Sequence, residues 1–398
     1  MGNSPHHTAS IHILDDDSFL NIFRLYRPAI FDGDEDNIDQ IKGGEGWDHE
    51  RWWYKLAHVC QRWQILILRS ASYLGLCLVC TRGTPVADML AHSPPLPLVI
   101  DYFNVYDGID VEDEEAIILA LKQRDRVRLG MTVWYMLKLI IAIDEEYPVP
   151  EYLIMESTVW DLTSTTVMLP KTFQAPRLRY LLLSGFALPM GSRLLTTALG
   201  IVMLTLDVGY PSAYFQPNTL LQRLSFMPQL EKLLIVFLLA PGLNHDVERQ
   251  LMHTSIISPV TLSNLRWIEF QVVSDYMETI VRRITTPRLE ELRIQFFCPL
   301  DFLIPCLLHF METTENLRID SAKFEFSRYM VYVGAYPSLR KEVDVYPISI
   351  NVFCGFLSRV SAVVQTFNSP GGIYPTVEHL TLEHKESNEE HNEVDRTE

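Results

Sequence analysis

The chain has 398 residues, of which 48% are hydrophobic, so it holds enough apolar material for a large core. Its formal net charge of −17 argues against general binding to nucleic-acid backbones, which depends largely on Lys and Arg. Six scattered cysteines in apolar runs indicate buried thiols in a reducing compartment, and there is no glycosylation sequon or signal-peptide core. No apolar run is long enough to span a bilayer. We therefore expect an intracellular protein, cytoplasmic or nuclear or both, that binds neither nucleic acid nor membrane.

Two segments near the N-terminus predict short amphipathic helices. Asp15 and Asp16 stand where a helix N-terminus favours carboxylates, and Pro28 ends the first run. Apolar residues recur at helical spacing in both segments, namely Phe19, Leu20, Phe23 and Tyr26 in the first and Trp53, Leu56, Val59, Cys60 and Trp63 in the second. Neither helix is long enough to be stable alone, so each must bury its apolar face against the other or against the rest of the protein.

The blocks Ile22-Phe23 and Val59-Cys60-Gln61-Arg62-Trp63 resemble those of the F-box, and the chain as a whole resembles fungal F-box proteins. The family's usual Leu-Pro start is Leu14-Asp15 here, and residues 32–50 form a long insertion. The resemblance implies a helical domain over 11–80 that binds the adaptor subunit of an SCF-type (cullin–RING) ubiquitin ligase. The residues that it implies for this contact, or for the packing behind it, are Leu14, Leu20, Ile22, Phe23, Val59 and Trp63.

The segments around this domain read as loops and connections. Residues 1–10 are polar and expected to be disordered, and the insertion 32–50 is rich in Gly and carboxylates, which predicts an exposed acidic loop. It lacks the Gly and the bidentate Glu that a calcium loop needs at fixed positions. Residues 81–98 carry several Gly and Pro and predict a joint, and Asp110–Arg124 predicts the first helix beyond it.

An apolar-x-x-apolar-x-apolar pattern recurs in the C-terminal part at spacings of 23 to 35 residues. The copies are Leu178/Leu181/Leu183, Ile201/Leu204/Leu206, Leu230/Leu233/Ile235, Leu265/Ile268/Phe270, Leu289/Leu292/Ile294, Thr314/Leu317/Ile319, Val345/Ile348/Ile350 and Val377/Leu380/Leu382, with weaker candidates around Val99 and Leu153. Helix-like segments lie between them, at Ser192–Leu199, Asn218–Phe226, His245–Met252, Asp275–Ile284, Phe302–Met311 and Phe353–Phe367. A strand followed by a helix at this period is typical of a leucine-rich repeat, and an ordinary α/β domain with Leu-rich strands is the alternative.

The predicted fold is therefore α/β: a small N-terminal helical F-box-like domain, then an irregular leucine-rich-repeat-like solenoid over 81–382, with parallel strands alternating with helices. The central residue of each copy should be buried on neighbouring strands, while intervening residues such as Arg179, Lys232, Arg266 and Glu291 should be partly exposed. Residues 383–398 predict a disordered acidic tail. Because the array ends on a bare strand at Leu382, we expect the chain to be a truncated member of a longer family.

No residues combine into a catalytic, cofactor-binding or metal site. Cys77-Leu78-Val79-Cys80 has the spacing of a zinc half-site, but no second ligand pair follows, so a core position is favoured. His379 and His384 fall on opposite faces of one strand and cannot share a metal there. With no P-loop, nucleophile elbow or HExxH motif, we expect no cofactor and no enzyme activity.

Two functions remain open. In the first, the chain is a substrate-recognition adaptor of an SCF-type ubiquitin ligase, in which the F-box-like domain binds the ligase adaptor and the solenoid binds a protein substrate. Alternatively, it is a repeat scaffold or ligand-binding module with no link to a ligase. The sequence leaves the identity of any substrate open, because fold does not specify ligand.

Overall fold

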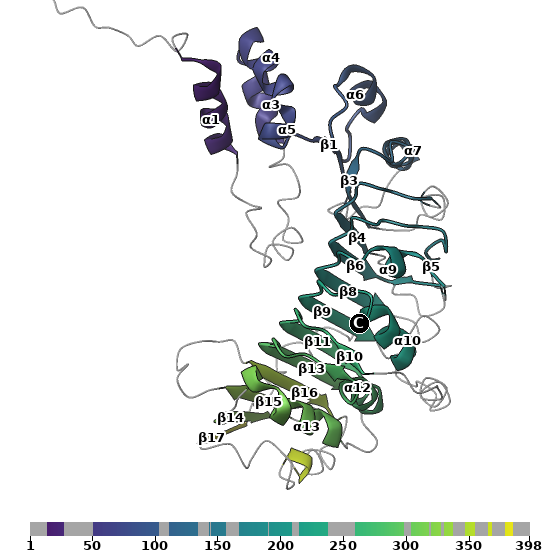
Figure 1. The fold of residues 1–398 in the computed structure, drawn as a ribbon, viewed down its shortest axis with the longest axis vertical. Helices are drawn as coiled ribbons and strands as arrows, with labels where there is room; N and C mark the ends of the chain where they lie inside the picture. Colours follow the sequence, from purple (N-terminus) through teal and green to yellow (C-terminus); the bar gives the residue numbers. More distant parts are fainter. Residues whose placement is uncertain are drawn as a thin grey trace, which may run out of the picture. The chain divides into compact units, whose positions relative to one another are not determined.

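The computed structural model describes residues 14–27, 51–102, 111–133, 143, 145–156, 167–189, 191–208, 215–237, 259–297, 304–317, 320–327, 330–336, 347–354, 365–367 and 379–384. They form a mixed α/β protein with a large, mostly parallel sheet (Figure 1). The chain divides into two compact units, Met1–Ile143 with Tyr147–Pro150 and Asp144–Glu146 with Glu151–Glu398. The expected boundary at residue 81 lies inside the first unit. The insertion 32–50 and both predicted disordered termini lie outside the described residues, apart from positions 383 and 384.

The first unit begins with helices and continues with parallel strands. The helices are α1 (Asp16–Tyr26), α3 (Trp52–Ala57), α4 (Gln61–Arg69) and α5 (Ala71–Leu74). They are followed by β1 (Leu78–Cys80), α6 (Val86–His92), β2 (Leu98–Tyr102), α7 (Val111–Leu121) and β3 (Val127–Val133). Strand β2 pairs in parallel with β1 and with β3. We call residues 14–27 and 51–74 the helical head.

The prediction of a single helix from Trp53 to Trp63 is wrong, because the helix is interrupted between α3 and α4. The backbone N–H of Val59 donates to the carbonyl of Leu56, which tightens the end of α3, and Cys60 is fully extended (φ −160°, ψ 163°). His, Val and Cys all have low helix propensity, which favours a break at this point. As a result Val59 and Cys60 lie in an exposed turn.

Side chains of the α3 region cover the outer edge of β1. The indole Nε1 of Trp53 donates to the carbonyl of Cys77 (3.1 Å), and Nη2 of Arg51 donates to the carbonyl of Val79 (3.4 Å). Trp53 is 5% exposed, and its neighbour Trp52 is buried as well. This edge therefore has partners for carbonyl groups that would otherwise be free to pair with another strand.

The second unit contains a row of parallel strands. In spatial order these are β4 (Tyr152–Glu156), β6 (Tyr180–Ser184), β8 (Met203–Val208), β9 (Lys232–Phe237), β11 (Trp267–Val272), β13 (Glu291–Phe297) and β16 (Ile348–Phe353). The sheet continues with β15 (Met330–Tyr336), antiparallel to β16, then β14 (Ser321–Phe326), antiparallel to β15, and β17 (His379–His384), parallel to β14. Two short pairs join β5 (Val167–Met168) to β7 (Phe186–Ala187) and β10 (Val260–Thr261) to β12 (Ile284–Thr285).

Helices α9 (Leu194–Thr197), α10 (Pro217–Leu224), α12 (Ser274–Val281) and α13 (Pro305–Thr313) lie along one face of this sheet (Figure 1). Each falls largely within a predicted helical segment. The segment His245–Met252 lies outside the described residues, and Phe353, expected to begin a helix, instead ends β16. One link within the helical layer was not predicted: the carboxylate of Glu278 on α12 accepts the backbone N–H groups of Cys306 and Leu307, both at 2.8 Å, at the start of α13.

The central residues of the repeated pattern form one row across the parallel strands. Direct pairing aligns Leu153, Leu181, Leu204, Leu233, Ile268, Leu292 and Ile348. From Leu181 to Ile348 these side chains are at most 1% exposed. The prediction that they occupy neighbouring strands and are buried is therefore confirmed for these six.

Two copies depart from the prediction. Leu317 is buried but lies in a short 3₁₀ helix, Glu315–Leu317, and not in a strand, because β13 pairs directly with β16. Leu380 does lie on a strand, but it is 46% exposed on β17. The regular parallel row ends at β16, since the antiparallel pair β14–β15 separates β16 from β17.

Candidate functional site

Helix α1 of the head begins where its sequence places it. The carboxylate of Asp15 accepts the backbone N–H of Ser18 (2.7 Å), which makes Asp15 the N-cap, and that hydrogen bond lowers the pKa of Asp15 below its ordinary value of 3.8. Asp16 and Asp17 follow in the first turn, where the helix dipole favours negative charge. The helix ends at Tyr26, and the extended backbone of Arg27 follows it.

Three aromatic rings join α1 to α4. Phe19 and Phe23 are almost fully buried, and the ring of Trp63 contacts both edge-on, with centroid distances of 5.5 and 4.9 Å. Edge-to-face pairs of this kind are favourable beyond the burial of their surface. The two helices, too short to be stable alone, are held together by this cluster.

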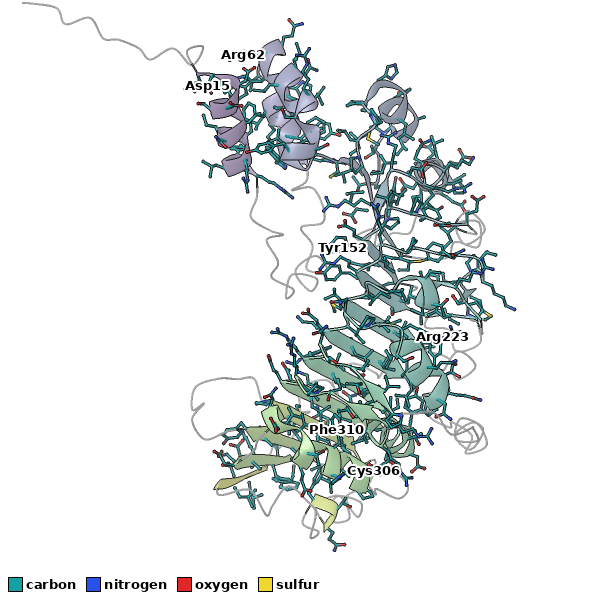
Figure 2. All side chains as sticks on the ribbon, in the orientation of Figure 1. Asp15, Arg62, Tyr152, Arg223, Cys306 and Phe310 are labelled. Carbon is teal, nitrogen blue, oxygen red and sulfur yellow. The ribbon has the colours of Figure 1, made fainter. Side chains whose placement is uncertain are left out.

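Arg62 ties the beginning of α4 to the beginning of α1. Its Nη2 donates to the carbonyl of Leu14 (2.9 Å) and to a carboxylate oxygen of Asp16 (2.7 Å), and its guanidinium carbon lies 4.9 Å from the ring centre of Phe19. Figure 2 shows Arg62 and Asp15 at the same end of the head. The stretch Leu14–Asp16 is therefore fixed in space, although the pair with Asp16 is exposed and contributes little by itself.

The six residues implied by the resemblance divide into two groups. Leu14, Ile22 and Val59 are exposed, at 36, 46 and 59% respectively. Phe23 is buried, while Leu20 and Trp63 are half-buried. The first group is available to a partner, and the aromatic members of the second hold the two helices together.

Further apolar side chains are exposed on the same head. Leu25 is 87% exposed and Tyr26 is 56% exposed on α1, Ile65 is 43% exposed on α4, and Tyr73 is 53% exposed on α5. Tyr26 was expected on the buried face, and the other three were not expected in the site at all. In the sequence, Leu25, Ile65 and Tyr73 are apolar residues outside the buried stripe of their helices. The sequence pattern alone does not distinguish such residues from apolar residues scattered over a surface.

A hollow of about 420 Å³ lies between the start of α1 and one face of α4. Its lining consists of Asp16, Gln61, Arg62, Ile65, Leu66 and Arg69. It combines Arg62, its partner Asp16 and Arg69 with the apolar side chains of Ile65 and Leu66.

The second unit offers the sheet face opposite its helices. Figure 2 shows Tyr152 on that side and Arg223 of α10 on the other. Tyr152 stacks on Tyr180 with a centroid distance of 4.5 Å, and Arg293 lies 5.8 Å from the ring centre of Trp267. The intervening positions of the pattern behave as predicted: Arg179 and Arg266 are exposed, and Lys232 and Glu291 are half-buried.

Cysteines and metal-ligating groups do not combine into a site in the part of the chain that the structure describes. Cys77 and Cys80 are both buried, and burial raises the pKa of Cys80 to about 12, so Cys80 does not ionise near neutral pH. Cys60 departs from the expectation of buried thiols because the break between α3 and α4 exposes it. No cluster of three His, Cys, Asp or Glu side chains able to hold a metal occurs among the described residues.

Of the helices that the structure describes, none has the length and apolar character to cross a bilayer. No protein-family model matches the chain, and no curated protein matches it.

Proposed function

We propose that this protein is the substrate-recognition adaptor of an SCF-type (cullin–RING) ubiquitin ligase. The helical head binds the adaptor subunit of the ligase, and the second unit binds a protein substrate. The observation that supports this function best is the exposure of Ile22 and Val59 next to the packed aromatic residues Phe23 and Trp63. Both exposed residues belong to the blocks on which the F-box resemblance rests. Exposed apolar side chains that form a contiguous patch are typical of a protein-binding surface, and the proposal requires these residues to form one.

For the second unit we propose a leucine-rich-repeat-like solenoid. The support comes from the five parallel strands β6, β8, β9, β11 and β13, which recur every 23 to 35 residues and carry buried leucines and isoleucines in register. Strand β16 extends the same row after a longer interval. The sheet face opposite the helices then holds the substrate, through residues such as Tyr152, Tyr180 and Trp267. In this function the protein performs no bond chemistry, since other subunits of the ligase transfer ubiquitin.

The proposal is tested by co-purification of the full chain with the ligase adaptor subunit. Ile22→Asp places a charge in the proposed contact, whereas Leu199→Asp changes an equally exposed leucine (51%) between α9 and β8. We expect the wild type and L199D to retain the adaptor and I22D to lose it. If none of the three proteins binds the adaptor although all are folded, the proposal is wrong. The alternative function, a scaffold without a link to a ligase, then replaces it.

A further inference from the structure

Strand β17 ends the sheet of the second unit and leaves two leucines in solvent. It pairs in parallel with β14, and no other strand that the structure describes pairs with its second edge. Its Leu382 stands in a row with Ile350, Val333 and Phe324, all of which are fully buried. Leu382 itself is 63% exposed, and Leu380 on the same face is 46% exposed. The apolar core of the sheet therefore continues to a strand that nothing described covers.

The edge strand of the first unit, β1, differs because side chains donate hydrogen bonds to its outer edge. There Trp53 and Arg51 donate hydrogen bonds to the outward carbonyls of Cys77 and Val79 on β1. Among the described residues, β17 has no comparable donor. A strand edge with free backbone groups and apolar side chains is a template for pairing with another strand.

We propose that β17 pairs antiparallel with β17 of a second copy of this chain, about a two-fold axis at Thr381. The order of residues in His379–His384 is self-complementary in this register. Leu380 of one copy stands opposite Leu382 of the other, and Leu382 stands opposite Leu380. Position 379 stands opposite Glu383, so no two like charges oppose each other.

A shift of the register by one residue removes this complementarity. Leu380 would then stand opposite Glu383, and position 379 would stand opposite His384. The register centred on Thr381 also continues the row of core residues without a step, from Phe324 through Leu382 to Leu380 of the second copy. The surface is a short strand pair, so it is a small interface, and we expect a weak and reversible dimer. It uses no residue of the helical head and does not depend on the proposed ligase function.

Sedimentation velocity of the full chain at increasing concentration tests the proposal. We expect the wild type to shift from monomer to dimer as concentration rises, and Leu382→Lys to remain monomeric. Leu199→Lys, the matched change at an exposed leucine elsewhere in the second unit, should dimerise like the wild type. Circular dichroism verifies that each variant is folded. A monomeric wild type, or a dimer that L382K leaves intact, overturns the proposal.

A cross-link reports the register directly. Directly opposed residues of an antiparallel pair have Cα atoms about 4.5–5.5 Å apart, which suits a disulfide. We expect Thr381→Cys to form a disulfide-linked dimer under mild oxidation, in a Cys60→Ser background that removes an exposed thiol. Leu199→Cys in the same background should not do so. Equal cross-linking of the two variants would contradict the two-fold pairing at Thr381.

Discussion

At the scale of residues, the head separates side chains that hold it together from side chains that it displays. Phe23 is buried between α1 and α4, while its neighbour Ile22 is 46% exposed. Adjacent residues of one helix point to different sides, so a motif that contains both serves packing and display at once. Substitutions at the two positions should therefore have different effects.

We expect Ile22→Ala and Val59→Ala to weaken binding to the ligase adaptor at least about tenfold, because truncation of an anchor residue in an interface commonly costs about 2 kcal/mol of binding free energy. The unfolding midpoint should stay unchanged. Phe23→Ala should instead lower stability, by about 3–5 kcal/mol as for other buried Phe residues. Titration calorimetry and thermal unfolding separate the two effects. A V59A protein that is destabilised but binds normally would show that Val59 belongs to the core.

The N-cap of α1 predicts a pH dependence. The pKa of Asp15 is lowered by the hydrogen bond from Ser18, so its ionised form stabilises the folded state. The contribution is complete above the ordinary pKa of 3.8 and is lost as pH falls through the lower pKa of the folded state. We expect Asp15→Ala to melt at a lower temperature than the wild type at pH 7, and the difference to shrink below pH 4. A difference that stays constant down to pH 2 would mean that the carboxylate does not act as the cap.

Among the strands and helices, the sequence predicted best those whose repeated residues are all buried in the same core. Leu204, Leu233 and Ile268 each hold the central position of the repeated pattern because each is buried in the same row, and this pattern is visible in the sequence. The break at Val59 was missed because the apolar spacing alone does not reflect the low helix propensity of His58, Val59 and Cys60. The placement of Leu317 outside the row was missed because it depends on the tertiary pairing of β13 with β16. The exposed Leu25 and Tyr73 were missed for the same reason: burial is decided by neighbours that the local sequence does not name.

Two leucines at the same place in the repeated pattern give a matched test of the array. Leu233→Ala removes a fully buried side chain in the middle of the row and should cost about 2–5 kcal/mol. Leu380→Ala, at a position that is 46% exposed, should change stability by less than about 0.5 kcal/mol. Chemical denaturation measures both. Equal losses would mean that the edge strand is packed as tightly as the centre.

The link between α12 and α13 gives a test within the helical layer. Glu278 accepts two N–H groups at the start of α13, and removal of its carboxylate leaves them without that partner. Hydrogen bonds to charged groups contribute about 1.5–3 kcal/mol, so Glu278→Ala should lower the free energy of unfolding by an amount in this range. Glu290→Ala, at an exposed glutamate, is the control and should have little effect. Hydrogen exchange in 305–313 should rise only in E278A.

At the scale of the whole molecule, two compact units suit two separate tasks. The first unit carries the exposed apolar residues Ile22 and Val59, and the second carries the long row of parallel strands. The insertion 32–50 lies outside the described residues, and its loop-like composition predicts that it contributes little to folding. A deletion within it that retains Trp52 and Trp53 should melt within a few degrees of the wild type, and a large drop would show a packed element.

In the proposed function, the helical head binds the adaptor subunit of a cullin–RING ligase. The most direct measurement is a calorimetric titration of the purified full chain with the purified adaptor subunit, with I22D and L199D in parallel. We expect saturable one-to-one binding by the wild type and L199D, and at least about tenfold weaker binding by I22D. Absence of binding by a folded wild-type chain would contradict it.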